Sequence, residues 1–556
     1  MRRSCLLLLL ASMVLRAAPQ AGLGGTISGS VTRSLTGEPV GSVRVLLWHR
    51  HARQSVTTDQ LGNFAFGGVP AGDVEVGLAG EGLRAGQARP FSRTEQTGGA
   101  RFLTLAAGQH IAELNLILTT GGSIAGRIVT PNGDPAVGTT VEIARAAYEF
   151  GGRCTLETIM SSRTDDRGLY RFFNVEAGEY YIRAANIPDP ESRRESRAFF
   201  PGTMEVSKAQ TIAVLEDQET GHIDFAISKT LVTQISGNFE LENSVGADAA
   251  FRVEARKVDG CDPGTYSIFR AGSDGFTGVV ATIGGAFEIV ASAAPTSSDP
   301  NPLLAVLQTR GNLSREKTHS GRTRVELGGA AVQGVTIKLR PLGQLTGQVR
   351  SVAGSEPIPV AALRAIVSYR DAASGAFVDE TYSDVTFNSS GAFATPMRSD
   401  GKPYFVIENL PGDAYVVDVR SQDKTVYDDL DTDVATLGPI EVFLDSRGGS
   451  VEGKVLDSRG NGAPAVLTIL LPEGRRANPL LYRTATTDRN GVFRINGVAP
   501  GNYKILACDR IPRYAWHNSD FLKPLETLAT AVQVQVAGSV NTVAVRLPSN
   551  SCLGRK

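Results

Sequence analysis

Aromatic side chains are scarce in this chain of 556 residues. They make up 7% of it, and only Trp48 and Trp516 are tryptophans, so few side chains are left to stack on a sugar or a base. Amphipathic helical stretches are almost absent, which excludes a helical bundle. Acidic and basic residues nearly cancel, with 57 Asp plus Glu against 56 Lys plus Arg, so no basic face for nucleic acid is indicated. The 61 glycines and 27 prolines indicate many turns between short strands.

Long hydrophobic runs are also missing beyond the N-terminus. Residues 1–21 combine Arg2-Arg3, the apolar run Cys5–Leu15 and a small-residue end, a pattern typical of a secretory signal peptide. The run is too short to span a bilayer, and no later one is a membrane anchor. Removing the three arginines of this leader changes the formal charge from −1 to −4. The sequence therefore predicts a protein that is secreted or periplasmic.

One short pattern recurs five times along the chain. A glycine flanked by strand-forming residues returns at spacings of 97, 111, 110 and 106 residues, which is the size of a small domain. These glycines are Gly29, Gly126, Gly237, Gly347 and Gly453. The predicted domains are 25–119, 120–229, 230–340 (divergent), 341–444 (with an insert at 395–403) and 445–550, called repeats 1 to 5 here. Short linkers predict that neighbouring repeats are coupled, but the sequence leaves open whether the repeats lie in a line, as a rod, or fold back.

The second half of the repeat is the more tightly specified. Three copies align without a gap from a Thr-Asp-x-x-Gly sequence that ends at Gly62, Gly168 or Gly491. Apolar residues follow two, four, twelve and fourteen positions later, which predicts two strands that each put one face on a core. The aspartate is predicted to bond the backbone of a turn in which glycine takes a positive φ. Metal binding by these aspartates is the less favoured interpretation, because no further acidic residues recur around them.

Five cysteines are present, and four remain after removal of the leader. An even number in an oxidising compartment permits disulfides. Cys508 and Cys552 lie in one repeat, and a bridge between them is favoured because it would tie down the tail. Cys154 and Cys261 lie in neighbouring repeats and are either a second bridge or two buried thiols.

The repeat motif resembles the carboxypeptidase regulatory-like domain, a prealbumin-like (transthyretin-like) β-sandwich. The residues that carry the resemblance in the first copy are Gly29, Pro39, Val40, Val45, Leu47, Thr58, Asp59, Gly62, Phe64, Phe66, Val69, Pro70, Gly72 and Val76. In the last copy they are Gly453, Pro464, Asp488, Gly491, Phe493, Val498, Pro500, Gly501 and Tyr503. The resemblance implies an all-β chain of five tandem antiparallel sandwiches of seven or eight strands. It implies no activity, since fold and function are separable.

One arrangement of residues mimics a zinc site. His110-Ile111-Ala112-Glu113 is followed by His222, a spacing similar to that of metallocarboxypeptidases. In the repeat alignment, however, Glu113 and His222 occupy the same position of two different repeats, one residue before Leu114 and Ile223. They are therefore predicted to lie at corresponding edges of two sandwiches. No phosphate-binding loop and no nucleophile motif is present, so the sequence predicts neither catalytic residues, a metal nor a cofactor.

Two interpretations of function follow. The first is a non-catalytic structural or interaction protein, similar to an adhesin, at the cell surface or in the periplasm, with an unknown protein partner. The alternative is a carbohydrate-binding protein with a polysaccharide ligand, since the prealbumin-like fold resembles starch-binding modules. Trp516, in a polar segment after the last sandwich motif, is the candidate sugar platform, and a role in capping the last core is the competing interpretation. An accessory unit of an outer-membrane receptor is a weaker third.

Overall fold

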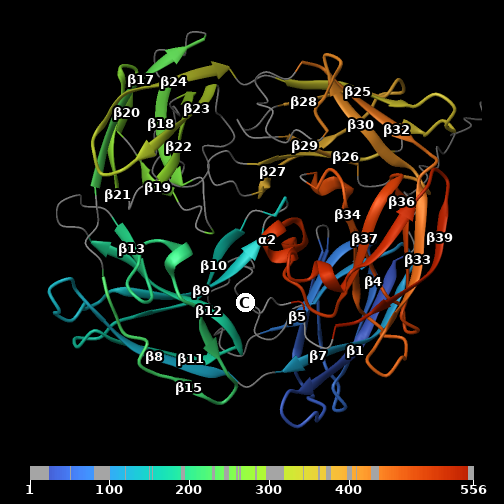
Figure 1. Ribbon diagram of the computed structural model, residues 1–556, viewed down its shortest axis with the longest axis horizontal. Helices are drawn as coiled ribbons and strands as arrows, with labels where there is room; N and C mark the ends of the chain where they lie inside the picture. Colours follow the sequence, from blue (N-terminus) through green and yellow to red (C-terminus); the bar gives the residue numbers. More distant parts are fainter. Residues whose placement is uncertain are drawn as a thin grey trace, which may run out of the picture.

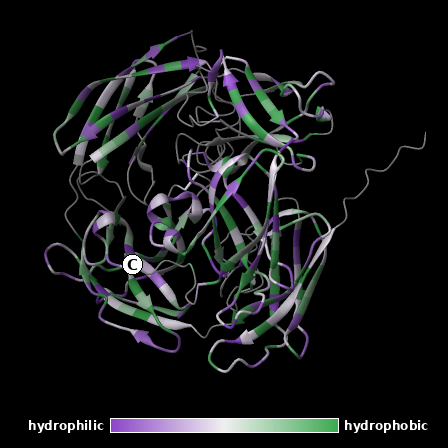
Figure 2. Cartoon of the chain, turned by 45° about the vertical axis from the view of Figure 1, so that its right-hand side comes forward, coloured by the Kyte–Doolittle hydropathy of each residue, from purple (hydrophilic) through white to green (hydrophobic). Residues whose placement is uncertain are grey.

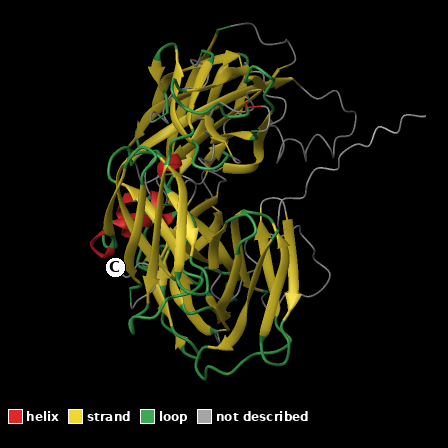
Figure 3. Ribbon diagram, turned by 90° about the vertical axis from the view of Figure 1, so that its right-hand side faces the viewer, coloured by secondary structure: helices red, strands yellow, loops and turns green. Residues whose placement is uncertain are grey.

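The structure is a computed structural model, and strands dominate it (Figure 3). It describes residues 24–49, 52–79, 101–118, 121–148, 151–152, 154–188, 195–227, 232–242, 249–257, 261, 265–268, 270–281, 285–295, 319–341, 344–360, 363–370, 377–396, 403–407, 410–427, 438–476, 478–548 and 552. The predicted leader at 1–21 and most of the predicted insert at 395–403 lie outside these ranges. The prediction of an all-β fold is confirmed.

Repeats 1 and 5 share one topology, in which a sheet of three strands faces a sheet of four. The orders are β4-β1-β7 and β3-β2-β5-β6 in repeat 1, and β36-β33-β39 and β35-β34-β37-β38 in repeat 5. The strands of repeat 1 are β1 (Gly25–Arg33), β2 (Arg44–His49), β3 (Ala52–Thr57), β4 (Asn63–Val69), β5 (Gly72–Leu78), β6 (Arg101–Leu105) and β7 (His110–Leu118). Those of repeat 5 are β33 (Gly449–Leu456), β34 (Leu467–Pro472), β35 (Arg483–Thr486), β36 (Val492–Val498), β37 (Gly501–Cys508), β38 (Thr530–Val534) and β39 (Ser539–Arg546).

Repeats 2 and 4 vary this plan at their later strands. In repeat 2, β12 pairs with an additional strand, β13, as well as with β14, and the last strand is divided into β15 and β16. In repeat 4, β30 joins the sheet of the first strand instead of the facing sheet. The strands of repeat 2 are β8 (Gly122–Val129), β9 (Thr140–Tyr148), β10 (Cys154–Arg163), β11 (Leu169–Val175), β12 (Gly178–Pro188), β13 (Glu195–Phe199), β14 (Ile212–Val214), β15 (Glu219–Thr220) and β16 (Phe225–Ala226). Those of repeat 4 are β25 (Gln344–Ser351), β26 (Ala365–Arg370), β27 (Phe377–Val385), β28 (Ala392–Pro396), β29 (Pro403–Ile407), β30 (Tyr415–Ser421), β31 (Lys424–Thr425) and β32 (Ile440–Asp445).

Repeat 3 is the most divergent copy in structure, as it is in sequence. Its eight strands form one continuous sheet because β23 pairs with both β22 and β24. The strands are β17 (Val232–Leu241), β18 (Ala249–Lys257), β19 (Thr265–Ile268), β20 (Arg270–Gly272), β21 (Gly275–Ala281), β22 (Gly285–Pro295), β23 (His319–Leu327) and β24 (Val332–Pro341).

The recurring glycine has a steric cause. In each repeat the first strand pairs with the last strand in parallel, the one departure from an otherwise antiparallel pattern. The two strands approach closely at the glycine, where a Cβ on Gly29 would lie 1.9 Å from the carbonyl oxygen of Leu114. A Cβ on Gly126 would lie 2.1 Å from the carbonyl oxygen of Ile223. The glycine of the motif therefore permits the pairing that closes each repeat.

Alternating strands produce one hydrophobic cluster per repeat, and Figure 2 shows the alternation along the strands. Two clusters accept a side chain from repeat 5: Ala465 packs into the cluster of repeat 1, and Leu481 into that of repeat 4. A sixth cluster lies at the surface of repeat 5 and includes Phe102 of repeat 1. Repeat 5 is therefore in contact with repeat 1, at the other end of the chain, as well as with its neighbour repeat 4.

The repeats follow one another around a closed path (Figure 1). Repeats 1 and 2 occupy the lower half of the view, repeats 3 and 4 the upper half, and repeat 5 returns to repeat 1. Hydrogen bonds join β6 to β35, strands that lie about 380 residues apart in the sequence. Of the two arrangements that the sequence leaves open, the structure has the folded-back one and not the rod, because the sequence pattern specifies each sandwich but not the surface on which it docks.

Candidate functional site

The contact between repeats 1 and 5, called the closure contact here, brings together buried ionisable side chains and an aromatic cluster that contains Trp516. Its polar part centres on Thr104 in β6. The Thr104 amide donates to the hydroxyl of Thr486 at 2.9 Å, and the Thr104 hydroxyl lies 2.6 Å from that of Thr484 and donates to Asp73 at 3.0 Å. The Gln109 side chain donates to the carbonyl oxygen of Thr486 at 3.0 Å. Strands β6 and β35 are thus joined by side chains and not by a continuous ladder.

Two ionisable groups of repeat 1, Asp73 and Arg101, lie in this contact, and the pKa of each is shifted by burial. Loss of water raises the pKa of the Asp73 carboxyl, and the positive charge of Arg513 opposes that shift. The guanidinium of Arg101 donates to the carbonyl oxygen of Ala465 at 2.6 Å. Burial lowers the pKa of Arg101 to about 10, while Asp509 acts in the opposite direction. Arg101 remains charged at neutral pH and holds repeat 1 to the backbone of repeat 5.

The apolar part of the closure contact is an aromatic cluster around Trp516. The ring of Phe102, from repeat 1, lies 5.3 Å from that of Trp516 and 6.4 Å from that of Tyr514. The guanidinium of Arg513 lies 5.3 Å from the centre of the Phe102 ring, within cation–π range. Among the described residues, Phe102 is the only member of the cluster that repeat 1 supplies.

Trp516 does not lie where a sugar platform requires it. Its side chain is 3% exposed, in a short 3-10 turn (Ala515–His517) that is followed by α2 (Ser519–Leu522). Stacking on a sugar needs an open aromatic face, and here Phe102 and Tyr514 cover the indole. Trp516 therefore contributes to the closure contact.

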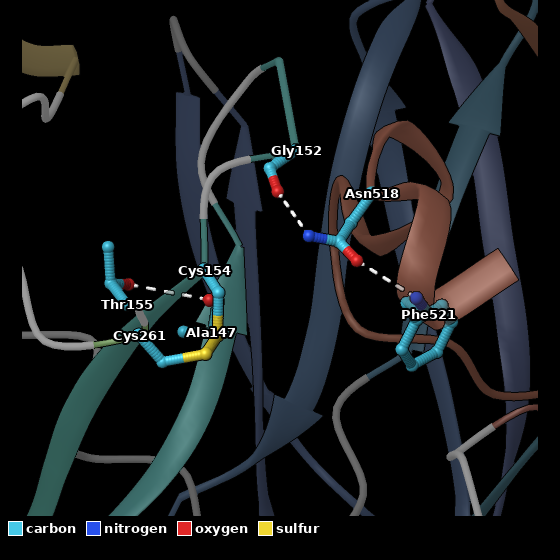
Figure 4. The surroundings of a disulfide bond; sticks show 7 residues. All are labelled: Ala147, Gly152, Cys154, Thr155, Cys261, Asn518 and Phe521. Carbon is cyan, nitrogen blue, oxygen red and sulfur yellow. Dashed lines mark hydrogen bonds between the residues drawn. A yellow bond between two sulfur atoms is a disulfide. The ribbon is translucent and has the colours of Figure 1, made fainter. Parts of the chain in front are cut away.

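The same segment also contacts repeat 2, as Figure 4 shows. Asn518 donates to the carbonyl oxygen of Gly152 at 2.8 Å, and the Gly151 amide donates to Nδ1 of His517 at 3.2 Å. Burial lowers the pKa of His517 to about 3, so the ring is neutral and its Nδ1 is able to accept. Gly152 has φ +83°, and a Cβ there would lie 2.3 Å from the His517 backbone. The β9–β10 turn is therefore fitted closely to repeat 5.

The four cysteines are joined in two pairs. Cys508 and Cys552 form a disulfide with an S–S distance of 2.06 Å, and both are buried in the cluster that contains Trp516. Cys154 and Cys261 form the other, at 2.05 Å, which connects repeat 2 to repeat 3. The strand that carries Cys154 starts two residues after Gly152 (Figure 4). The β9–β10 hairpin of repeat 2 is thus attached to repeats 3 and 5 at once.

The zinc-like spacing has a structural explanation. Glu113 and His222 both have φ +60°, and Gly334 at the equivalent position of repeat 3 has φ +72°. Each lies just before the residue that faces the motif glycine, where the parallel pairing of repeats 1 and 3 shifts register. They are bulge positions in separate sandwiches. Among the described residues, no group of three or more His, Cys, Asp and Glu side chains is placed to hold a metal ion.

The predicted turns are confirmed. One Oδ of Asp59 accepts from the amides of Leu61 and Asn63 at 2.9 and 2.8 Å, and these bonds lower the pKa of its carboxyl. Asp165 and Asp488 make the same pair of bonds in repeats 2 and 5. Their carboxylates are thus engaged by backbone N–H groups, as expected of a turn.

The threonine before each of these aspartates has a role that the sequence analysis missed. The Thr487 hydroxyl donates to the carbonyl oxygen of Ala463 at 2.7 Å and accepts from the amide of Val466 at 2.9 Å. Thr58 and Thr164 make equivalent bonds. The signal was present, since threonine recurs in all three aligned copies at a position where the turn itself needs no hydroxyl.

The closure contact was also missed, and one signal for it exists. Strand β34 reads Leu467-Thr468-Ile469-Leu470-Leu471-Pro472 and is buried along its whole length. A nearly continuous apolar run is typical of a strand that is covered on both faces. The outer cover consists of Phe102 and the 515–522 segment, neither of which is marked by the repeat motif.

Comparison with known proteins gives one family match and several remote structural likenesses. No curated relative matches the chain. The solved structures found include GBS52, the minor pilin of Streptococcus agalactiae, at 13% identity and a TM-score of 0.21, covering 37% of this chain and 98% of that one. BcpA, the major pilin of Bacillus cereus, gives 12% identity and 0.14, covering 76% and 98%. The TIE protein of Bacillus anthracis gives 11% and 0.15, and the match spans about half of each chain.

Scores this low carry no conclusion about this chain. The family match is local and falls on repeat 1, where the sequence motif is clearest. Residues 26–98 are similar to the carboxypeptidase regulatory-like domain, which confirms the resemblance predicted from the motif.

Proposed function

We propose that this chain is a non-catalytic exported protein that acts as a structural or interaction module at the cell surface or in the periplasm. The observation that supports this best is the closure contact. There, the scarce aromatic residues and the buried ionisable groups connect one sandwich to another instead of lining a reactive pocket. A closed set of sandwiches with tied ends is suited to holding its outer surfaces in fixed positions.

Export is the first component of the proposal. The two disulfides support it, because such bonds persist in oxidising compartments. None of the helices in the described part of the chain has both the length and the hydrophobicity to cross a bilayer. We further propose that residues 1–21 are removed on export and that the repeat boundaries given above are domain boundaries.

Export is tested by producing the chain in a bacterial host with and without residues 1–21. Thiol alkylation followed by mass spectrometry then counts free cysteines in each cell fraction. The version with the leader is expected outside the cytoplasm, with Cys154, Cys261, Cys508 and Cys552 all protected. Retention in the cytoplasm with reactive thiols would contradict the proposal.

The non-catalytic role is tested with the purified mature chain. Saturable binding to isolated cell envelopes without turnover of peptide, ester or glycoside substrates is expected. Turnover of any of these substrates would exclude the proposal. Saturable binding to one polysaccharide alone would favour the carbohydrate alternative, which the covered position of Trp516 does not support.

A further inference from the structure

Strand β11 of repeat 2 presents an apolar edge to solvent. In the part of the chain that the structure describes, it is the terminal strand of the sheet β11-β8-β15 and pairs with a strand on one side only. Tyr170 and Phe172 point into the core, whereas Leu169, Arg171 and Phe173 alternate with them on the outer face. Leu169 is 39% exposed and Phe173 is 60% exposed. Edge strands of soluble proteins are usually blunted by charge, proline or a cover, and two exposed apolar residues are a departure from that rule.

The fold does not require these two residues. Strands β4 and β36 are the equivalent strands of repeats 1 and 5, and the gap-free alignment identifies their outward positions. These are Asn63, Ala65 and Gly67 in β4, and Val492, Arg494 and Asn496 in β36. The same sandwich is therefore built with Asn or Val in place of Leu169, and with Gly or Asn in place of Phe173. An apolar pair at both ends of the edge is specific to repeat 2 among the three aligned copies.

We propose that β11 is a docking edge for a second copy of this chain, which adds its own β11 in antiparallel orientation and extends the sheet across a two-fold axis. The register follows from the side chains. Centring the pair on Arg171 places Leu169 of each copy opposite Phe173 of the other, twice, on one face of the joined sheet. Aromatic–aliphatic cross-strand pairs stabilise sheets, and a two-fold contact uses the same patch on both copies.

The charges on the edge fit this register. Arg171 would face Arg171 across the axis, which is unfavourable for bare charges. Each Arg171, however, lies 2.5 Å from Glu219 on β15 and 4.7 Å from the centre of the Phe173 ring. Strand β15 lies on the far side of β8 from the exposed edge, so each Arg171 side chain is held away from the axis by its own Glu219, and each pair carries no net charge. The half-exposed positions of both groups keep the desolvation cost small.

The edge is also accessible. Strands β8, β11 and β15 lie at the lower left rim in Figure 1, away from α2 and β34 of repeat 5. A second copy is able to reach it without displacing repeat 5. One short strand pair buries less than the roughly 1,600 Å² of a standard stable interface, so the dimer is weak in solution and strengthened where many copies are held together.

Cysteine cross-linking tests the contact and its register. All four cysteines of the mature chain are in disulfides, so Arg171→Cys introduces a single free thiol that lies on the proposed axis. Arg494→Cys, at the equivalent outward position of β36, is the matched control. Under mild oxidation the mature Arg171→Cys protein is expected to form a covalent dimer at least about tenfold faster than the control. Equal rates in the two proteins would overturn the proposal.

Two measurements test the role of Leu169 and Phe173. The first is the cross-linking rate of variants that also carry Arg171→Cys, and the second is sedimentation velocity of the same variants without the added cysteine. Phe173→Asn introduces the residue that repeat 5 carries, and it is expected to reduce cross-linking and self-association by about tenfold with unchanged circular dichroism. Leu215→Asn, which removes another exposed leucine of repeat 2, is expected to change neither. Cross-linking unaffected by Phe173→Asn would overturn the proposal. So would a polysaccharide whose binding needs Phe173 while sedimentation stays monomeric. Either of these results would leave the proposal of export untouched, because the export experiment does not depend on a contact between two copies of the chain.

Discussion

Truncation of Phe102 tests whether the ring of repeats is held closed by the contact described above. Phe102 is 7% exposed although it belongs to repeat 1 and its neighbours Trp516, Tyr514 and Arg513 belong to repeat 5. Removing a buried phenylalanine side chain costs about 3–5 kcal/mol, and most of that loss would fall on the contact instead of on either sandwich. Phe102→Ala is therefore expected to leave each sandwich folded and to open the ring.

Hydrogen exchange followed by mass spectrometry measures this opening directly. If exchange in β35 and in residues 515–522 occurs through opening of the contact, a loss of about 3 kcal/mol accelerates it by roughly a hundredfold. The radius of gyration from small-angle X-ray scattering is expected to increase in parallel. Phe287→Ala, which empties the fully buried core of repeat 3, is the matched control and is expected to accelerate exchange in repeat 3 alone. Unchanged exchange in β35 and residues 515–522 of Phe102→Ala would show that Phe102 does not maintain the closure.

Three other perturbations give separate tests. Burial lowers the pKa of His517 to about 3 from its ordinary value of 6.5. Between these two pH values the unfolded chain binds a proton at this ring and the folded chain does not. The stability of the closure contact should therefore fall as the pH is lowered from 6.5 towards 3. Exchange of the Gly151 and Gly152 amides should show this fall in the wild type and much less of it in His517→Asn, and equal pH profiles would refute the role of His517. Thr487→Val leaves the amide of Val466 and the carbonyl of Ala463 without the Thr487 hydroxyl, and should lower the free energy of unfolding of repeat 5 by about 1–3 kcal/mol in urea. Thr527→Val, at an exposed position of the same repeat, should leave it unchanged. The double change Cys154→Ser and Cys261→Ser should destabilise the attachment of repeat 3 by about 2–4 kcal/mol, seen as faster proteolysis of repeat 3, while the same change at Cys508 and Cys552 should act on the tail instead.

Local pattern predicted much of the fold within a repeat. Period-two pairs such as Phe64 and Phe66 face the core, and Asp59 makes the predicted turn, because both features depend on residues within a few positions of each other. The parallel pairing of Gly29 with Leu114 was not predicted, because the residues of the two strands do not determine which strand pairs with which. The sequence shows the glycine as a marker of the repeat, and only the structure shows its steric cause.

The closure contact lay beyond the sequence for a different reason. Arg101 and Thr104 have the polarity of ordinary outward strand residues, and only the structure shows that repeat 5 covers them. Trp516 was selected because tryptophan is rare and its segment is polar, but rarity does not distinguish a binding platform from an interface residue. The apolar character of both faces of β34 was the available evidence that a further layer covers that sheet.

The closed path also constrains the order of assembly. Arg101 and its acceptor Ala465 are 364 residues apart, so when chain emerges from a ribosome or an export channel N-terminus first, repeat 1 is complete long before its docking surface exists. During that interval Phe102 has no cover, and the slow, long-range search for repeat 5 comes last. Chains that stall before repeat 5 would carry an uncovered apolar and polar docking surface on an otherwise finished sandwich, so repeat 1 is the part of an incomplete chain most exposed to unwanted association.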